Sequence, residues 1–120
     1  MITVASALEA VNVIEPGEYI WCHSMAATPA LLLNGVADHA ADCGGLTLMQ
    51  LHLEYADRLL DESLEGRLRH RCFFAGRETR KLINEGRADY VPAFLSEIPK
   101  LFRKGEQRID TALVQVSPSC

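Results

Sequence analysis

The sequence is 120 residues long, 48% of its residues are apolar, and its formal net charge is −4 at neutral pH. This length fits one domain, and the apolar content suffices for one hydrophobic core, which excludes a disordered chain. Polar residues break the apolar runs well before the roughly 18 residues that a membrane span needs, so a soluble protein is expected. Because Glu9 interrupts the first apolar stretch and no basic segment precedes it, we expect no signal peptide and a cytoplasmic location.

The charges are distributed unevenly along the chain. Residues 1–57 contain seven acidic residues and no Lys or Arg, whereas residues 58–120 contain nine acidic and twelve basic ones. Coenzyme A, which carries several phosphates, is one ligand for such a basic region, but a solvated face with ion pairs is the simpler interpretation. Nucleic acid is not an expected partner, because the isoelectric point is near 5.5 and no aromatic residues alternate with the bases. The clustered bases are Arg67, Arg69, Arg71, Arg77, Arg80, Lys81 and Arg87.

The four cysteines are Cys22, Cys43, Cys72 and Cys120. None forms a Cys-x-x-Cys pair, so the spacing indicates neither a zinc site nor a redox motif. The first three lie in or beside apolar runs and are predicted to be buried thiols, and Cys120 is predicted to be exposed.

Strand and helix patterns alternate along the chain. Segments such as YIWC at 19–22 and LTLMQLHL at 46–53 are typical of buried strands, whereas 3–14 has apolar residues at helical spacing. Segment 54–66 is charged and irregular and is expected to be a surface excursion with a helical turn. In chain order, the predicted elements are a helix at 3–14, a strand at 18–23, a helix at 28–43, strands at 46–53 and 68–74, a helix at 76–85, a strand at 88–94, a helix at 96–105 and a strand at 111–117.

Residues that cap or end helices set several of these boundaries. Thr28 is the predicted N-cap of the second helix, with Pro29 in its first turn, and Gly44-Gly45 follows its end. Ser96 is the predicted cap of the last helix. Together the elements predict an α/β fold with an open, mostly parallel sheet that helices cover on both faces, built from right-handed crossovers.

In such sheets, ligands bind beyond the carboxyl ends of the strands. This rule selects three groups of candidate binding residues. They are His23 and Ser24 after the first strand, His52 and Glu54 after the second, and residues 76–79, with Gly76 and Glu78, after the third.

Two of these candidates, His23 and His52, have side chains that act as general bases or metal ligands in other proteins. No third ligand is specified, so structural roles are favoured and no metal is expected. Glu54 lies two residues from His52, a spacing that allows both side chains to share a face and form an acid–base pair. The chain lacks the G-x-S-x-G, G-x-G-x-x-G and P-loop motifs, and neither Ser24 nor Ser96 has an evident base.

Several segments together resemble the acetyl-CoA hydrolase/transferase family, most closely its 4-hydroxybutyrate CoA-transferase branch. The resemblance covers nearly the whole chain, and its fourth segment is the most specific. The segments are HSMAATPALLL at 23–33, LHLE at 51–54, EGRLRHRCFFAG at 65–76, NEGRADYVPAFLSEIPKLFRKG at 84–105 and DTALVQVSP at 110–118.

The resemblance implies two related α/β domains with the active site between them. In that family a glutamate attacks the acyl-CoA thioester to give a mixed anhydride and then a glutamyl-CoA thioester, which an acceptor carboxylate resolves. That glutamate belongs to the C-terminal half, and no position here matches it, so no catalytic residue is expected in this chain. The resemblance thus implies that 1–120 is a truncated N-terminal domain, with acyl-CoA and a small carboxylate as substrates, no separate cofactor, and a C-terminal domain or subunit as partner.

Two positions depart from the family pattern. Glu78 stands where relatives usually carry an asparagine, and Arg71-Cys72 replaces a more typical small polar pair. A carboxylate near a site for anionic substrates repels them, so Glu78 indicates a different substrate or relaxed selection.

Three functional hypotheses follow. The first is the N-terminal half of a CoA-transferase, inactive alone. The second is a non-catalytic remnant that keeps the fold and only packs against a partner, and the third is a free-standing hydrolase that uses His52 or Glu54. Truncation after Val116 is expected to leave apolar surface and a strand edge that the missing half would cover, which predicts self-association or poor solubility.

Overall fold

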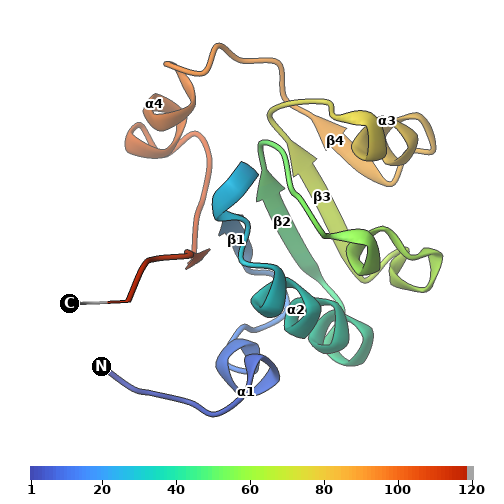
Figure 1. Cartoon of the computed structure of the whole chain (residues 1–120). Coiled ribbons are helices and arrows are strands. Elements are labelled where there is room, and N and C mark those ends of the chain that lie inside the picture. The colour runs from blue at the N-terminus through green and yellow to red at the C-terminus, as the bar shows by residue number, and fades with distance from the viewer. Residues whose placement is uncertain (119–120) are drawn as a thin grey trace.

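The computed structural model describes residues 1–118 and contains one sheet of five strands in the order β4-β3-β2-β1-β5 (Figure 1). All four strand pairs are parallel, which confirms the predicted α/β class with an open parallel sheet. The predicted exposure of Cys120 lies outside the described residues. The strands are β1 Tyr19–Cys22, β2 Leu46–Gln50, β3 Leu68–Cys72, β4 Ala88–Tyr90 and β5 Thr111–Leu113, and the helices are α1 Ala7–Val11, α2 Ala30–Cys43, α3 Arg77–Asn84 and α4 Ile98–Arg103.

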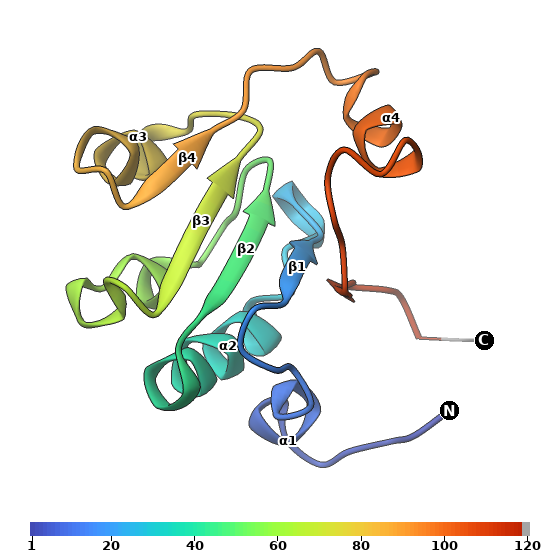
Figure 2. The same ribbon diagram turned by 180° about the vertical axis from the view of Figure 1, so that it is seen from behind.

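Strand β1 lies inside the sheet, between β2 and β5. Ile20 is in register with Leu48 on one side and with Thr111 on the other. The chain proceeds from β1 to β4 at one edge and then returns across the sheet to form β5 at the opposite edge (Figures 1 and 2). The strand order therefore reverses beside β1.

One face of the sheet carries the main core. Because side chains alternate along a strand, Ile20, Leu48 and Leu68 all point to this face, where they pack against Val36 of α2. Leu82 of α3 covers the same face farther along and packs on Cys72 and Ala88. The buried aliphatic residues of α2 thus account for the docking of the longest helix.

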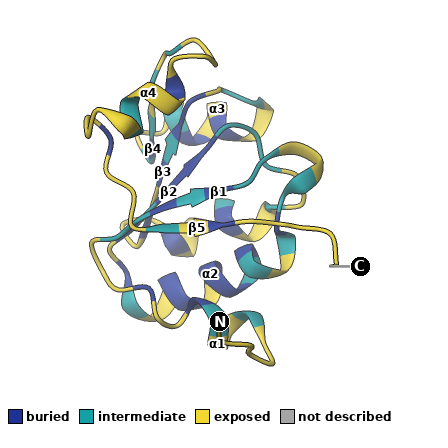
Figure 3. Cartoon of the chain, turned by 90° about the vertical axis from the view of Figure 1, so that its left-hand side faces the viewer, coloured by how far each residue is buried: buried dark blue, intermediate teal, exposed yellow. Residues whose placement is uncertain are grey.

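The opposite face is covered by α4. Met49 and Phe73 pack there against Ile98, and the ring of Trp21 meets that of Phe102 edge-on at 5.4 Å between centroids. Figure 3 shows the sheet as a layer between α2 and α4. The predicted covering of both faces by helices is confirmed.

The segment predicted as a surface excursion contributes to the core. It forms two 3-10 turns, Asp57–Leu60 and Glu62–Leu64, in which Leu59 and Leu64 are 2% and 3% exposed. These leucines join the cluster under α2. The excursion therefore replaces the helix that usually covers a β–β crossover.

Both predicted helix caps are wrong. The Thr28 hydroxyl donates to the carbonyl of Met25 at 2.6 Å and accepts from the amide of Glu54 at 3.2 Å, so α2 begins later, with Pro29 in the cap position. Ser96 lies in a turn, and α4 begins after Glu97. In both cases the predicted cap residue belongs to the turn that precedes the helix. This is the 3-10 turn Met25–Ala27 before α2 and the turn at residues 95–97 before α4.

Several elements are shorter than predicted. The first helix covers only Ala7–Val11, where Ser6 accepts from the amide of Glu9 as the cap. Strand β4 ends at Tyr90, because Pro92 has no amide hydrogen to continue the ladder. Strand β2 ends at Gln50, since the carbonyl of His52 accepts from the amide of Met25 instead of from a neighbouring strand.

The prediction of three buried thiols is confirmed for Cys22 and Cys72 but is wrong for Cys43, which is only partly buried. Burial raises the pKa values of Cys22 and Cys72 to about 12 and about 11. Arg69 forms two hydrogen bonds with the Asp89 carboxylate, at 2.6 and 2.8 Å, and these lower the pKa of Asp89. No helix among residues 1–118 has the length and apolar character needed to cross a membrane.

Candidate functional site

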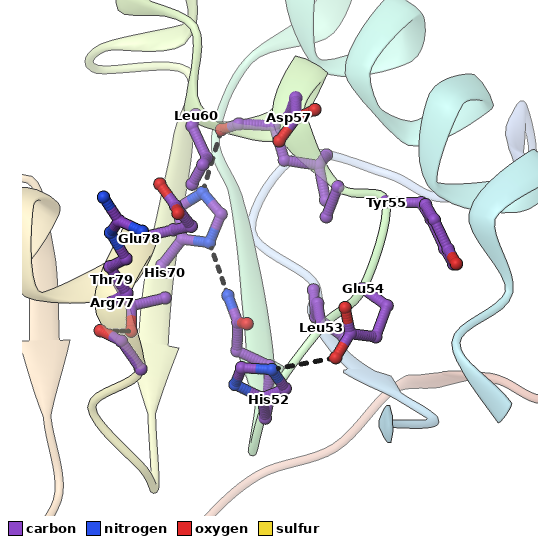
Figure 4. Close-up of a pocket in the computed structure, with 14 residues that line it drawn as sticks. His52, Leu53, Glu54, Tyr55, Asp57, Leu60, His70, Arg77, Glu78 and Thr79 are labelled. Atoms are coloured by element: carbon purple, nitrogen blue, oxygen red, sulfur yellow. Dashed lines mark hydrogen bonds and ion pairs between the residues drawn. The ribbon is translucent and has the colours of Figure 1, made fainter. Parts of the chain in front are cut away.

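A pocket of about 220 Å³ lies beyond the carboxyl ends of β2 and β3, on the face that α2 and α3 cover (Figure 4). The loop after β2, the first 3-10 turn of the excursion and the first turn of α3 form its walls. Gln50, His70 and Thr79 contribute buried polar side chains to its lining. The pocket thus lies beyond the carboxyl ends of strands, as ligand sites of parallel sheets do, but not at the reversal of strand order beside β1.

His52 and Glu54 form an ion pair or hydrogen bond at the rim of this pocket. The distance from His52 Nε2 to Glu54 Oε1 is 3.1 Å, and the two side chains are 35% and 48% exposed (Figure 4). Both residues lie in the loop beyond β2 and not in the strand. The pairing that the two-residue spacing allowed is therefore present, but a loop positions it.

Gly76 leaves room for the imidazole ring of His52. A Cβ atom at position 76 would lie only 2.9 Å from His52 Nδ1, closer than real contacts of this type. The ring of Phe74 meets the same imidazole edge-on, at 6.3 Å between centroids. The loop after β3 therefore fixes the place of His52 from the other side of the pocket.

The loops after β1 and β2 are tied to each other. The Ser24 hydroxyl accepts from the amide of Leu51 at 3.4 Å, and the amide of Met25 donates to the carbonyl of His52 at 2.8 Å. Met25 and Tyr55 have positive φ angles of 58° and 54°, which are unfavourable for residues with a side chain. The rim of the pocket is thus held by specific contacts in a strained backbone.

A buried chain of hydrogen bonds forms the floor of the pocket. His70 Nε2 lies 3.0 Å from the carbonyl oxygen of Leu59, and His70 Nδ1 lies 2.8 Å from Nε2 of Gln50 (Figure 4). Burial lowers the pKa of His70 to about 4, so the ring is neutral at neutral pH. Because a backbone carbonyl only accepts, Nε2 of His70 carries the proton, and Nδ1 accepts from the amide group of Gln50.

The charged residues around the pocket are mainly acidic. Glu54, Asp57 and Glu78 line it, and Arg77 is the basic residue among them. Arg69, Arg71 and Arg87 make their ion pairs elsewhere in the fold. This charge pattern disfavours the phosphate groups of a ligand inside the pocket and favours an uncharged group.

The sequence matches the acetyl-CoA hydrolase/transferase N-terminal domain family over residues 2–119. The chain belongs to this family. Its relatives include a succinyl-CoA:acetate/propanoyl-CoA:succinate CoA transferase of Fasciola hepatica, 36% identical over 92% of this chain, and a 4-hydroxybutyrate coenzyme A transferase of Clostridium kluyveri, 31% identical over 95% of it.

Solved structures agree with this family assignment. RipA from Yersinia pestis superposes with a TM-score of 0.82 and 29% identity over 92% of this chain. A 4-hydroxybutyrate CoA-transferase from Porphyromonas gingivalis, at 19% identity and a TM-score of 0.67, shares the fold. The chain spans 23% and 27% of the first two relatives and 28% of RipA, so it corresponds to about a quarter of each.

Within this family domain, four of the predicted binding residues come together and two do not. His52, Glu54, Gly76 and Glu78 all line the pocket. His23 instead faces the β5 side, where its Nδ1 lies 3.4 Å from the amide of Gln115, and Ser24 joins the two loops. A substrate-binding role for any of the six remains a prediction.

Sequence reasoning missed the floor residues Gln50 and His70. A signal was available, because the pattern of β3 places His70 at an inward position between Leu68 and Cys72, where an unpaired polar side chain is costly. In residues 1–118, no three His, Cys, Asp or Glu side chains are grouped as metal ligands are.

Proposed function

We propose that this chain is the N-terminal part of a CoA-transferase that moves coenzyme A between an acyl-CoA and a small carboxylate of the acetate or 4-hydroxybutyrate type. The match of nearly the whole chain to a family whose curated relatives are CoA-transferases carries this proposal. The reacting glutamate comes from a C-terminal half, and the pocket beyond β2 and β3 forms one wall of the substrate cleft.

Two features of the structure support a shared cleft. The pocket opens at a rim where His52 and Glu54 are partly exposed, so a second domain can approach it. Apolar side chains are exposed beyond the end of β4, with Phe94 at 78% and Leu95 at 71%. An exposed apolar group of this kind is typical of a surface that packs against another domain.

The test is a chimera in which this chain replaces the matching N-terminal segment of the Fasciola hepatica relative. We expect the chimera to transfer coenzyme A from acetyl-CoA to succinate or 4-hydroxybutyrate, and the 120-residue chain alone to show no transfer. Transfer by the chain alone would place the nucleophile in this sequence and contradict the proposal.

A partner-packing module without catalysis is the second candidate, because the exposed Phe94 and Leu95 would serve packing without catalysis equally well. Calorimetry of this chain with coenzyme A and with the separately made C-terminal half of the relative, together with a transfer assay on the mixture of the two halves, separates the two functions. Binding of the C-terminal half without restored transfer supports the packing module, whereas restored transfer supports the first proposal.

A further inference from the structure

The hydrogen-bond chain at the pocket floor fixes which end of the Gln50 amide faces the ligand. Leu59 contributes a carbonyl, which accepts only, so the neutral ring of His70 donates through Nε2 and accepts through Nδ1. The NH₂ group of Gln50 must then point to His70, at 2.8 Å. The carbonyl oxygen Oε1 of Gln50 is left for another partner.

The side chain of Gln50 borders the pocket. Among the residues that the structure describes, none donates a hydrogen bond to Gln50 Oε1, whereas the NH₂ group of Gln50 is bonded to His70. Gln50 is only 2% exposed, and the space it lines is the pocket.

We propose that Gln50 presents Oε1 as a fixed acceptor for an uncharged hydrogen-bond donor, and that this donor is a hydroxyl group on the acyl part of the substrate. The inference rests on the proposed function. Glu54, Asp57 and Glu78 add further acceptors and negative charge to the lining, which disfavours a carboxylate or phosphate here. An amide N–H of the pantetheine arm of coenzyme A has the same donor chemistry and is the other source of such a group.

His70 is a positioning residue in this arrangement, because it acts on the ligand only through Gln50. A ring with the proton on Nδ1 would turn the amide around and present its NH₂ group to the pocket. The buried ring, with its pKa near 4, keeps the acceptor orientation throughout the neutral range. Specificity for a donor is thus set through the hydrogen bond from Gln50 to His70.

The experiment measures binding of matched neutral probes to the 120-residue chain by nitrogen-15 NMR. We expect methyl 4-hydroxybutanoate to bind about fivefold more tightly than methyl butanoate, which has no N–H or O–H donor, because the hydroxyl adds one neutral hydrogen bond. Gln50→Met should bring the ratio of the two affinities to about one, whereas the same substitution at the exposed Gln115 should leave the ratio unchanged. His70→Leu, which frees the amide to rotate, should lower the ratio toward that of Gln50→Met.

Two direct readouts keep the proposal open to refutation even when a variant fails to fold. The ring nitrogens of His70 should show a protonated Nε2 and a bare Nδ1, and the opposite tautomer would overturn the orientation of Gln50. Equal binding of the two esters to the wild-type chain would overturn the hydroxyl assignment.

A third probe, pantetheine, distinguishes the two sources of the donor. Gln50-dependent binding of pantetheine, without any preference between the esters, would retain the acceptor and assign its donor to the coenzyme arm instead of the acyl group. These measurements use the isolated chain and no C-terminal half. Their outcome is therefore independent of transfer by the chimera, which tests the proposed function.

Discussion

His70 shows how a single buried residue couples the excursion to the sheet. It hydrogen-bonds Leu59 in the first 3-10 turn and Gln50 at the end of β2, while its own backbone lies in β3. No local sequence pattern links these three segments. Residue types and spacing predicted the His52–Glu54 pair, which is local, but they did not predict this contact, because residues 50, 59 and 70 come together only when the crossovers close.

Acid should destabilise the protein through His70. The unfolded ring has its ordinary pKa near 6.5, and the folded ring has a pKa of about 4, so the unfolded state binds more protons between these values. The free energy of unfolding should therefore fall by about 3 kcal/mol as the pH drops from above 6.5 to 4. Urea unfolding at a series of pH values measures this loss.

The control for this prediction is His70→Gln, which removes the titrating group. The variant should be less stable than wild type at pH 7. The difference in the free energy of unfolding should shrink as the pH falls, because only the wild type has a ring at position 70 that gains a proton on unfolding. A difference that stays constant from pH 7 to pH 4 would show that another group causes the acid sensitivity.

Gly76→Ala should displace His52. Position 76 has φ −72° and ψ 174°, which alanine adopts freely, so the contact of the new methyl group with the imidazole is the expected cause of any change. Because His52 is partly exposed and can rotate, the loss of stability should stay within about 1 kcal/mol. The proton shifts of the His52 ring report the displacement.

Glu54→Gln is the matched comparison for Gly76→Ala, because it removes the charge of the carboxylate without adding volume. We expect the His52 ring to keep its contact with Phe74 in this variant and to lose it in Gly76→Ala. Identical ring shifts in Gly76→Ala and the wild type would show that the loop after β3 yields instead of His52.

At the scale of elements, the sequence predicted which helices and strands exist and in what order, but it did not predict where they begin and end. Apolar strands and amphipathic helices follow from local periodicity, and all nine predicted elements are present. The cap at Thr28 failed because a distant loop binds its hydroxyl. The cap at Ser96 failed because Ser96 lies in a local turn that the hydrogen bond from the amide of Glu97 to the carbonyl of Phe94 closes. Thr28 binds the amide of Glu54, which lies 26 residues away.

The packing of α1 on α2 depends on Gly35. A Cβ atom there would lie 3.0 Å from the backbone carbon and oxygen of Ala7. Gly35→Ala gains about 1 kcal/mol of helix propensity but forces α1 away, which typically costs 1–3 kcal/mol. We expect net destabilisation of about 1 kcal/mol in urea unfolding.

Ala41→Gly in the same helix calibrates the propensity term, since Ala41 is exposed. Ala41→Gly should lower the free energy of unfolding by about 1 kcal/mol without moving α1. Stabilisation by Gly35→Ala would mean that α1 shifts at no cost and that its close approach to α2 is not required.

At the scale of the whole molecule, the two edges of the sheet differ. The β4 edge is followed by Pro92 and carries Asp89, features that discourage pairing with other strands. The β5 edge is followed by Val114 and Val116, which are 55% and 75% exposed, and no charged residue separates them. The family relatives are about four times longer than this chain, so other parts of those proteins can cover such an edge.

The 120-residue chain should therefore self-associate through β5. Val116→Lys should reduce the apparent mass in light scattering at high concentration, because a charge blocks edge pairing. Leu31→Lys, on the exposed side of α2, is the control and should leave association unchanged. A stable wild-type monomer at high concentration would contradict this prediction.

The return of the chain to β5 also sets an order of assembly. Tyr19 and Asp110 exchange two hydrogen bonds, at 2.8 and 2.9 Å, across 91 residues of sequence. During synthesis, β1 to β4 can pair as they emerge from the ribosome, but one side of β1 stays open until residues 111–113 have been made. Contacts this distant in sequence form late, and short edge strands open first. We infer that hydrogen exchange in the finished protein is fastest along β5, so the last strand to join the sheet is also the first to leave it.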